Sequence, residues 1–550
     1  MSGILPPAST YDACYAQFNW QIPQRFNIAT AVCDRHADCS PDNTAIVFED
    51  TDGSQKRLTF GQLQSESNRL ANVLTHFGIR RGDRVAIHLP QSFEAAVAHI
   101  AAYKLGAIAL PLFSLFGPDA LRHRLADSGA RILLTCQANL PVIEAVRDDL
   151  GELEHIIVTD GSAVDAQDLN GLMEKASDCF KTIDTAAEDP AMLIYTSGTT
   201  GDPKGALHAH RVLLGHLPGV EFPHRYFPQQ SDLFWTPADW AWAGGLLDVL
   251  LPSLFHGVPV LAKRFDKFEP EAVFQLMARH GVRNTFMPAT ALRMLRQFPT
   301  PEKFDVKLRS VASGGEALGE DLIGWGRETL GVTINEFYGQ TEVNLVVGNN
   351  GDVMPIKPGS MGRPIPGHQV GVIDDDGREV AVGEIGVVAV RRPDPVMFLE
   401  YWNNPAATSA KFLGDWCLLG DLAWRDDDGY LWFKSRDDDV IISSSYRIGP
   451  TEVEECLNQH PMVAMSGVIG SPNSIRGEIV KAYVVLADDV IGDDDLRADI
   501  QAHVKQQLSA HEYPREICFL DELPLTVTGK IQRMRLRERD AKERADTQPN

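Results

Sequence analysis

Cysteine is scarce in this sequence, and its spacing matches no common metal or redox motif. The eight cysteines form no CxxC pair, and they lie at positions 14, 33, 39, 136, 179, 417, 456 and 518. Thiolate zinc sites need closely spaced ligands, so a zinc module of that kind is not expected. The pattern predicts reduced, mostly buried thiols in a reducing compartment.

Positive charge is also in short supply. The 51 Lys and Arg residues face 75 Asp and Glu residues, which gives a formal net charge of −24. Such a field argues against a general nucleic-acid binder and against attachment to anionic lipid by overall charge. Local basic sites for phosphate groups remain open.

The sequence lacks a long, clean hydrophobic run. Its longest apolar stretch, from Ala95 to Phe116, is interrupted by His99, Lys104 and Pro111, whereas a bilayer helix needs about 20 apolar residues. The N-terminus shows no charged segment followed by an apolar one, as a secretory signal would. We therefore expect a soluble, cytoplasmic protein without a membrane span.

The 550 residues, 44% of them hydrophobic and 23% charged, have an ordinary globular composition. A capping box, Thr59 with Gln62, predicts a helix that continues to Phe77. Strand 85–89, helix 92–105 and strand 107–112 then form a βαβ unit, and further strands are expected at 131–135, 155–159, 191–196 and 333–337. The alternation predicts an α/β fold whose sheets are mainly parallel and covered by helices.

After about residue 365 the pattern changes to short strands and polar turns. We predict a large N-terminal domain, residues 1–437, whose residues 366–437 form a β-rich, β-barrel-like subdomain, and a small mobile α+β domain, residues 438–550. A second capping box, Thr451 with Glu454, is expected to open a helix. The last residues, from Glu538 on, have the composition of a frayed tail.

The strongest local signal is YTSGTTGDPKG, Tyr195 to Gly205, directly after a predicted strand. Its glycines, hydroxyl groups and one cation, Lys204, can surround phosphate oxygens. It is not a Walker-type P-loop, because Gly205 follows the lysine where Ser or Thr is required. Composition alone leaves a solvated linker as an equally good interpretation.

Two more polar segments carry candidate ligands. NEFYGQTEVN, Asn335 to Asn344, follows another predicted strand, and loops at the carboxyl ends of parallel strands meet in one crevice. Glu342 there could hold Mg²⁺ and Tyr338 could stack on a base. Further along, Asp421 and Arg436 could bind ribose hydroxyls. For each single residue, plain solvation is the competing interpretation.

Together these segments resemble the adenylate-forming (AMP-binding) superfamily, which includes acyl-CoA synthetases, nonribosomal peptide adenylation domains and firefly luciferase. The resemblance covers nearly the whole chain and depends on six ordered motifs: YTSGTTGDPKG, SGGEAL, EFYGQTE, GDLAWRDDDGY, SRDDDVIISSSYRIGPTEVE and LPLTVTGKIQRMRL. The branch it resembles most is that of the medium-chain acyl-CoA synthetases, whose RIGPxEVE and TGKIQR strings this chain carries.

The resemblance implies an ATP-dependent acid:CoA ligase that uses ATP, Mg²⁺ and CoA and acts in two steps. A carboxylate attacks the α-phosphorus of ATP to give an acyl-adenylate and pyrophosphate, and the CoA thiol then displaces AMP. The carboxylate is already nucleophilic at neutral pH, which agrees with the lack of a recognisable Ser/His/Asp or Cys/His set in the sequence.

The family pattern also implies site residues. Catalytic roles fall to Lys530, Lys204, Glu342 and Thr341, with Glu342 as the metal ligand and Asp438 as the hinge. The ATP site comprises Thr196, Ser197, Gly198, Thr199, Thr200, Gly315, Glu316, Ala317, Glu336, Phe337, Tyr338, Gly339, Gln340, Asp421 and Arg436. CoA would meet Ser444, Ser445 and Arg447, although many members have Gly where Ser445 stands.

The acyl pocket is expected from Trp240, Trp242, Gly244, Met287, Gly314 and Gly339. Acetate-selective members carry Trp at the position of Gly339, so this chain should accept a medium-chain, branched or aromatic acid. The competing interpretation of the aromatic residues is ordinary core. His208 and His210 are better explained by packing beside the phosphate loop than by metal binding.

Two other functions stay open at this point. The chain could adenylate an acid for a carrier protein, or it could be a nucleotide-binding homologue with weak catalysis. For the acid:CoA ligase the expected partners are a small carboxylic acid, ATP and CoA, with no nucleic acid, and a homo-oligomer is possible.

Overall fold

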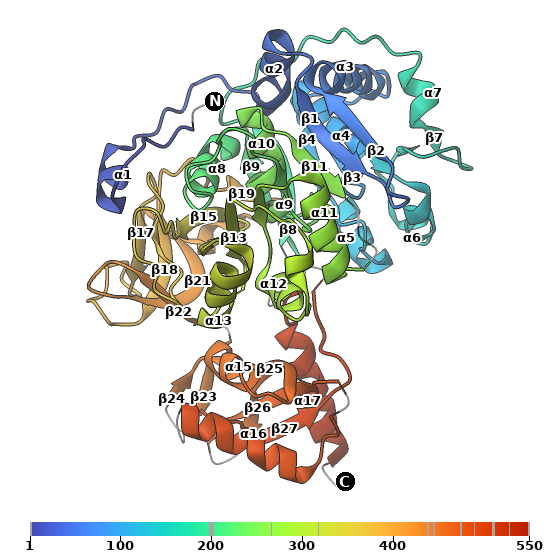
Figure 1. Cartoon of the computed structure of the whole chain (residues 1–550). Helices are drawn as coiled ribbons and strands as arrows, with labels where there is room; N and C mark the ends of the chain where they lie inside the picture. Colours follow the sequence, from blue (N-terminus) through green and yellow to red (C-terminus); the bar gives the residue numbers. More distant parts are fainter. Residues whose placement is uncertain are drawn as a thin grey trace. The chain divides into compact units, whose positions relative to one another are not determined.

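The computed structural model describes residues 3–196, 203–263, 265, 267–316, 318–436, 439–443, 446–473, 476–488, 490–508, 512–526 and 529–547. Their contacts divide the chain into two compact units. The first contains the described residues up to 370 together with residues 390–417, and the second contains residues 371–389 and those from 418 on. Each unit is described by itself (Figure 1).

The first unit contains an eight-stranded sheet that begins with the predicted βαβ unit. Its strand order is β19-β9-β8-β4-β3-β5-β6-β7. The bounds are β3 (Arg84–His88), β4 (Ile108–Pro111), β5 (Ile132–Thr135), β6 (His155–Val158), β7 (Gln167–Asp168), β8 (Pro190–Thr196), β9 (Lys204–Ala209) and β19 (Glu400–Tyr401). Strands β3 to β8 are parallel to their neighbours, while β9 and β19 are antiparallel additions.

A nine-stranded sheet lies in the same unit, in the order β16-β15-β14-β13-β12-β10-β11-β1-β2. The bounds are β1 (Thr44–Glu49), β2 (Gln55–Thr59), β10 (Phe234–Trp235), β11 (Val260–Lys263), β12 (Asn284–Phe286), β13 (Ser310–Gly314), β14 (Ile334–Gln340), β15 (Val343–Gly348) and β16 (Arg363–Pro364). Its central pairings are parallel. The prediction of mainly parallel sheets is therefore confirmed.

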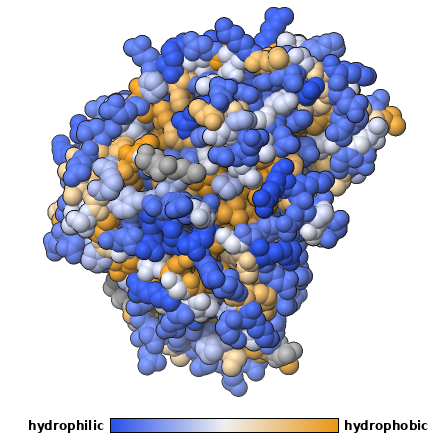
Figure 2. Space-filling model, turned by 45° about the horizontal axis from the view of Figure 1, so that its top comes forward, coloured by the Kyte–Doolittle hydropathy of each residue, from blue (hydrophilic) through white to orange (hydrophobic). Residues whose placement is uncertain are grey.

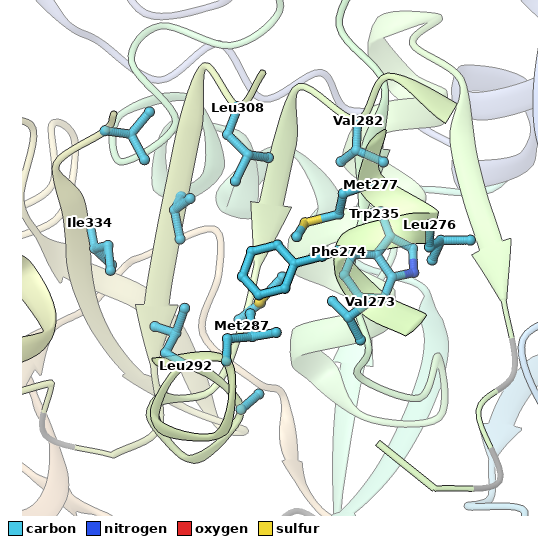
Figure 3. Packing of buried hydrophobic residues seen from close by; sticks show 14 of the residues in the cluster. Trp235, Val273, Phe274, Leu276, Met277, Val282, Met287, Leu292, Leu308 and Ile334 are labelled. Atoms are coloured by element: carbon cyan, nitrogen blue, oxygen red, sulfur yellow. The ribbon is translucent and has the colours of Figure 1, made fainter. Parts of the chain in front are cut away.

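Helices pack on these sheets. The longer ones are α3 (Phe60–His76), α4 (Phe93–Lys104), α5 (Pro118–Ser128), α8 (Val212–Glu221), α11 (Pro270–His280) and α12 (Ala289–Arg296). The predicted capping box is present at α3, where Gln62 N donates to Thr59 Oγ1 and Thr59 N donates to Gln62 Oε1. Figure 3 shows the core between α11, α12 and the nine-stranded sheet, with Trp235, Phe274 and Met287 among its buried side chains.

The second unit is richer in antiparallel strands. Strands β17 (Val370–Ile373), β18 (Gly386–Arg391), β21 (Trp416–Arg425), β20 (Phe412–Leu413) and β22 (Leu431–Arg436) make one sheet, most of whose residues belong to this unit. A second sheet has the order β24-β23-β26-β25, with β27 on β26; its bounds are β23 (Ile441–Ser443), β24 (Tyr446–Ile448), β25 (Val463–Asn473), β26 (Gly477–Leu486) and β27 (Glu516–Phe519). The β-rich and α+β segments are thus confirmed, whereas closure into a barrel and the domain boundaries stay predictions.

Two local predictions in this unit are wrong. Helix α15 (Pro450–Asn458) is capped by Gly449 without a side-chain hydrogen bond, so Thr451 and Glu454 form no capping box. Glu454 is buried and binds Arg533 instead. The expected tail is also structured, because α17 spans Arg533–Thr547 and its Asp540 pairs with the buried Lys481 at 2.7 Å. A charged sequence looked unstructured because its partners lie far away in the chain.

The eight cysteines are free thiols, and five of them are buried. Among the described helices, none is both long and apolar enough to cross a bilayer. The visible face in Figure 2 is mainly hydrophilic, and the most exposed large hydrophobic side chains, Leu115, Val164 and Ile491, come from three separate segments.

Candidate active site

The glycine-rich segment is carried by a hairpin of β8 and β9. Thr196 at the end of β8 is the register partner of Lys204 at the start of β9, and Thr196 Oγ1 donates to the carbonyl of Lys204 at 3.4 Å. The carbonyl of Pro203 accepts a hydrogen bond from His123 Nε2 at 2.8 Å. The two ends of the segment are therefore held close together.

This hairpin is tied to helix α5 by Tyr195 and to the segment after β19 by Trp402. Tyr195 donates its hydroxyl to Asp127 Oδ2 at 2.5 Å, and burial together with Asp127 raises the pKa of the phenol. The backbone N of Trp402 donates to the carbonyl of Gly205 at 2.7 Å. A Cβ on Gly205 would lie 2.9 Å from the side chain of Leu193, so only glycine fits beside that side chain at this position.

Lys204 and Glu342 meet at a third side chain, Tyr401, which sequence reasoning missed. Tyr401 in β19 is the register partner of Ala206 in β9, and its hydroxyl donates to Glu342 Oε1. Lys204 Nζ lies 5.6 Å from the centre of the Tyr401 ring, in cation–π range. The strand that carries Tyr401 lies beside β9 in Figure 1. No local motif marks this tyrosine, and only the pairing of β19 with β9 brings it to the site.

The backbone reinforces the same junction, because Phe398 N donates to the carbonyl of Glu342 at 2.8 Å. Glu342 follows β14 in one sheet, whereas Phe398 and Tyr401 flank the edge of the other. The two polar loops predicted to share a crevice are therefore joined through these contacts.

Glu342 has the chemistry of a metal ligand. It is buried, and its carboxylate accepts a hydrogen bond while keeping further lone pairs. The described residues contain no group of three or more His, Cys, Asp or Glu side chains arranged for a metal ion. A single carboxylate still suits Mg²⁺, which usually takes its other ligands from phosphate oxygens and water.

His208 lies beside the backbone of Thr341, the residue predicted to contact the α-phosphate. Its side chain is completely buried, and burial lowers its pKa to about 3, so the ring is neutral near pH 7. His210 is also buried, and its Nδ1 accepts from Ile28 N at 3.2 Å. These contacts favour the packing interpretation of both histidines.

The predicted adenine segments are neighbours in the nine-stranded sheet. Gly314 at the end of β13 pairs with Phe337 of β14, and Ser313 pairs with Glu336. The chain then turns at Gly315, whose φ of +86° favours glycine. Glu316 Oε2 accepts from Thr290 Oγ1 at 2.8 Å and from Arg293 Nη1 at 3.3 Å, which fixes its carboxylate. Beyond Glu336, the residues Tyr338, Gly339, Gln340 and Thr341 are half-buried.

Aromatic rings fill the space beside the candidate acyl-pocket glycines. The ring of Phe286 lies 5.6 Å from that of Trp242 and 5.2 Å from that of Phe337, centre to centre. A Cβ on Gly244 would lie 2.7 Å from Phe286, and one on Gly314 would lie 2.4 Å from Phe337. These glycines allow the rings to approach the backbone.

The other predicted wall residues differ in position. Met287 lies in the core shown in Figure 3, with Phe274 and Leu292, rather than with the three rings. Trp240 is 2% exposed, and its indole N–H has no hydrogen-bond partner among the described residues. Asp248 is buried and accepts from Asn344 Nδ2 at 2.7 Å, and burial raises the pKa of its carboxyl. An acid inside the apolar run GGLLDVLL was a signal for this buried pair.

Gly339 lies against the backbone of β15. A Cβ there would lie 2.2 Å from the backbone N of Leu345 and 2.7 Å from the Cα of Asn344. A side chain at this position would press on the β15 backbone first. The expectation that Gly339 leaves the acyl pocket open stays a prediction.

The second unit contains the predicted ribose residues and the predicted catalytic lysine. Asp421 and Arg436 are register partners on β21 and β22, with Arg436 Nε 3.4 Å from Asp421 Oδ1. Lys530 is exposed. The remaining predicted residues, Ser197, Gly198, Thr199, Thr200, Ala317, Asp438, Ser444 and Ser445, lie outside the described residues, as does the side chain of Arg447.

Comparison with known proteins adds an independent finding. Residues 33–402 match the family "AMP-binding enzyme", and residues 452–530 match "AMP-binding enzyme C-terminal domain". An acetyl-coenzyme A synthetase of Bacillus subtilis (strain 168) is 36% identical over 541 residues, covering 95% of this chain and 94% of its own. The mitochondrial acyl-coenzyme A synthetase ACSM3 of Homo sapiens is 35% identical over 549 residues, covering 97% of this chain and 93% of its own.

A solved structure is similar as well. The anthranilate CoA ligase AuaEII, in complex with anthranoyl-AMP, has a TM-score of 0.87 and 31% identity, covering 95% of this chain and 99% of its own.

Six of the buried histidines are expected to make the fold sensitive to acid. Burial lowers the pKa to about 3 for His99, His208 and His224, and to about 4 for His88, His210 and His216. The unfolded chain protonates histidine as pH falls below about 6.5, whereas these folded sites stay neutral. The free energy of unfolding should therefore fall as pH drops from 6.5 to 4, by up to about 1.4 kcal/mol per pH unit for each histidine.

The urea midpoint measured between pH 7 and pH 5 tests this expectation. His88→Leu should reduce the slope, and the exposed His76→Gln should leave it unchanged. A midpoint independent of pH in the unmodified protein would contradict it.

Proposed function

Because the chain belongs to the AMP-binding enzymes and is an ATP-dependent acid:CoA ligase, we propose that it activates a fatty, branched or aromatic carboxylic acid larger than acetate. We further propose that the reaction needs Mg²⁺. The observation that carries the proposal of the ATP site is the meeting of Lys204 and Glu342 at Tyr401.

The chemistry needs positioning and charge neutralisation rather than a strong base. The acid carboxylate attacks the α-phosphorus, the bond from that phosphorus to the α,β-bridging oxygen breaks, and acyl-adenylate forms as pyrophosphate leaves. The CoA sulfur then attacks the acyl carbon, and AMP leaves to give the thioester. In each step negative charge develops on phosphate oxygens, and cations and N–H groups stabilise that charge.

Residues of the first unit would bind the polyphosphate. Lys204, held beside Thr196 by the hairpin, would neutralise phosphate charge, and Thr341 would donate its hydroxyl to the α-phosphate. Glu342, oriented by Tyr401, would hold Mg²⁺. When bound, the ion would neutralise charge on the phosphate oxygens. Neutral His208 under Thr341 would keep that backbone in a dry environment.

Residues of the second unit would complete the reaction. Asp421 would accept hydrogen bonds from the ribose hydroxyls, with Arg436 beside it. We propose that the chain divides at residues 437 and 438 and that the C-terminal domain turns about Asp438. Lys530 would stabilise the charge that develops during adenylation, and Ser444, Ser445 and Arg447 would serve CoA.

Three aromatic rings support the proposed size of the acid. Trp242, Phe286 and Phe337 pack together beside Gly244 and Gly314, and such rings bind apolar acyl groups well. The relatives named above include both an acetyl-coenzyme A synthetase and a ligase solved with anthranoyl-AMP, so the size must come from this chain's own residues.

A product assay tests the function and the acid class. The protein is given ATP, Mg²⁺, CoA and single acids from acetate to octanoate, and benzoate, and acyl-CoA is measured by mass spectrometry. Each methylene buried should improve kcat/KM by about fourfold, since it contributes about 0.8 kcal/mol. Acetate as the best substrate would contradict the proposed acid class.

Trp242→Leu is the matching pocket variant. The half-buried Trp242 ring borders Phe286, so its removal should shift the preference toward longer acids by about tenfold in kcat/KM ratio. Trp432→Leu, in β22 and stacked on Trp424, is the control and should keep the wild-type profile. An unchanged profile in Trp242→Leu would place the acyl site elsewhere.

The two half-reactions separate the proposed roles of Lys530 and Arg447. Lys530→Ala should slow adenylation by about 10² to 10³, by analogy with removal of one charge-stabilising donor, while thioester formation from supplied acyl-adenylate continues. Arg447→Ala should show the reverse. Equal loss in both half-reactions for either variant would contradict its assigned role.

A further inference from the structure

Asp439 directly follows the proposed hinge residue and is almost completely buried, at 4% exposed. Both of its carboxylate oxygens are bound by α17: Arg533 Nη1 donates to Oδ2 at 3.2 Å, and Arg537 Nη2 donates to Oδ1 at 2.6 Å. A buried carboxylate is tolerated only when it is paired and hydrogen-bonded. The chain that leaves the hinge is therefore fixed to the first turns of α17.

Arg533 has a second buried partner in α15. Its Nη2 donates to Glu454 Oε2 at 2.5 Å, and its Nε donates to Oε1 at 3.2 Å, in a forked geometry. Glu454 Oε1 also accepts from the backbone N of Val468 in β25 at 2.8 Å. One guanidinium thus joins the segment after the hinge, helix α15 and helix α17. We call Asp439, Glu454 and Arg533 the Arg533 cluster.

The loop that carries Lys530 ends at this cluster. Lys530 N donates to Thr526 Oγ1 at 3.0 Å, and Thr526 N donates to the carbonyl of Lys530 at 2.7 Å. Gln532 N donates to the carbonyl of Pro524 at 2.8 Å, one residue before α17 begins at Arg533. The backbone of Lys530 therefore has little freedom relative to Arg533.

The middle of α17 is anchored independently. Asp540 accepts from Lys481 Nζ at 2.7 Å and from Ser471 Oγ at 2.8 Å, and Lys481 Nζ also donates to Glu543 at 3.0 Å. Lys481 and Asp540 are both buried. Two sets of contacts thus hold α17. Its middle turns bind β25 and β26, and its first turns bind the segment after the hinge.

We infer that Arg533 is a positioning residue for Lys530: it locks Asp439 to α17, so that the segment leaving the hinge and the Lys530 loop move as one body. The inference rests on the proposed roles of Asp438 and Lys530. A rotation at the hinge then moves Lys530 together with the segment that leaves the hinge.

The consequence concerns rate rather than substrate binding. A catalytic group displaced by about 1 Å can lose about 10²-fold in rate. Loosening the Arg533 cluster should therefore lower kcat of adenylation and leave the KM for ATP unchanged. Thioester formation from supplied acyl-adenylate does not use Lys530 and should be spared.

A merely structural ion network is the competing explanation, and α17 offers a matched control. Asp540→Asn removes a buried carboxylate from the middle of the same helix, about two turns further from Lys530 than Arg533 is. If α17 only stabilises the domain, Asp540→Asn and Asp439→Asn should have the same effect on every measurement.

The test compares Asp439→Asn, Arg533→Lys and the double variant Arg533→Met/Glu454→Gln with Asp540→Asn in the full-length protein. Arg533→Met alone would leave the buried carboxylate of Glu454 without its charged partner and is expected to unfold the domain. In the double variant Glu454→Gln removes that charge, so the domain should fold. Adenylation is followed by ATP–pyrophosphate exchange, the second half-reaction by thioester formation from supplied acyl-adenylate, and loop order by hydrogen exchange of the amides of Gly529, Lys530 and Gln532.

Asp439→Asn and the double variant should lose about 10- to 100-fold in kcat of adenylation, with KM for ATP and the second half-reaction unchanged and faster exchange of the three amides. Arg533→Lys should recover part of the rate, and Asp540→Asn should match the unmodified protein. Equal kcat and equal amide exchange in Asp439→Asn and Asp540→Asn would overturn the inference.

Lys530→Ala, measured alongside, separates this outcome from failure of the proposed function. Full adenylation activity in Lys530→Ala would reject the role of the lysine, while the amide exchange rates would still decide whether the Arg533 cluster orders its loop. Slow adenylation in Lys530→Ala with full activity in Asp439→Asn would reject the cluster alone.

Discussion

The hydrogen bond from the Tyr401 hydroxyl to the Glu342 carboxylate is the interaction on which the candidate ATP site depends. Glu342 is buried at the junction of two sheets. Leaving a buried carboxylate without its hydrogen-bond donor costs about 1 to 3 kcal/mol or more of folding free energy. Tyr401 supplies that donor from an edge strand of one sheet, and Phe398 fixes the backbone of Glu342 from the same edge. The same tyrosine presents its ring to Lys204. One side chain thus sets the distance between the cation and the carboxylate that the proposed chemistry requires.

The same principle recurs in the rest of the molecule, where partners distant in the chain fix each functional segment. Aromatic rings from three elements meet over Gly244 and Gly314, which gives the proposed acyl site rigid apolar walls. In the second unit, buried ion pairs have the corresponding role, since Arg533 binds carboxylates from two other segments and Lys481 binds two carboxylates of α17. Rigid support of this kind suits a reaction that is catalysed mainly by positioning.

Local patterns in the sequence were enough for much of the fold. The capping box at Thr59, the βαβ alternation and the strands that precede the polar loops are properties of short windows, and the structure has them. The errors have a common cause. Thr451 is not a cap because α15 begins one residue earlier, at Pro450 after Gly449, and Glu454 binds Arg533, 79 residues away, instead. The charged C-terminal helix is held by Lys481, which pairs with its Asp540 and Glu543. Tyr401 joins the site because β19 pairs with β9. Contacts between distant segments decide the role of Glu454, the C-terminal helix and the place of Tyr401, and no short window of sequence contains such contacts.

Calorimetric titration of ATP, with and without Mg²⁺, tests the central claim most directly. If Lys204 and Glu342 form one polyphosphate and metal site, the unmodified protein should bind ATP more tightly with Mg²⁺. Glu342→Gln should remove that dependence on Mg²⁺, and Lys204→Met should weaken binding about tenfold or more under both conditions, since one charge-assisted contact contributes about 1.5 to 3 kcal/mol. A dependence on Mg²⁺ that is unchanged in Glu342→Gln, or full affinity in Lys204→Met, would contradict the account.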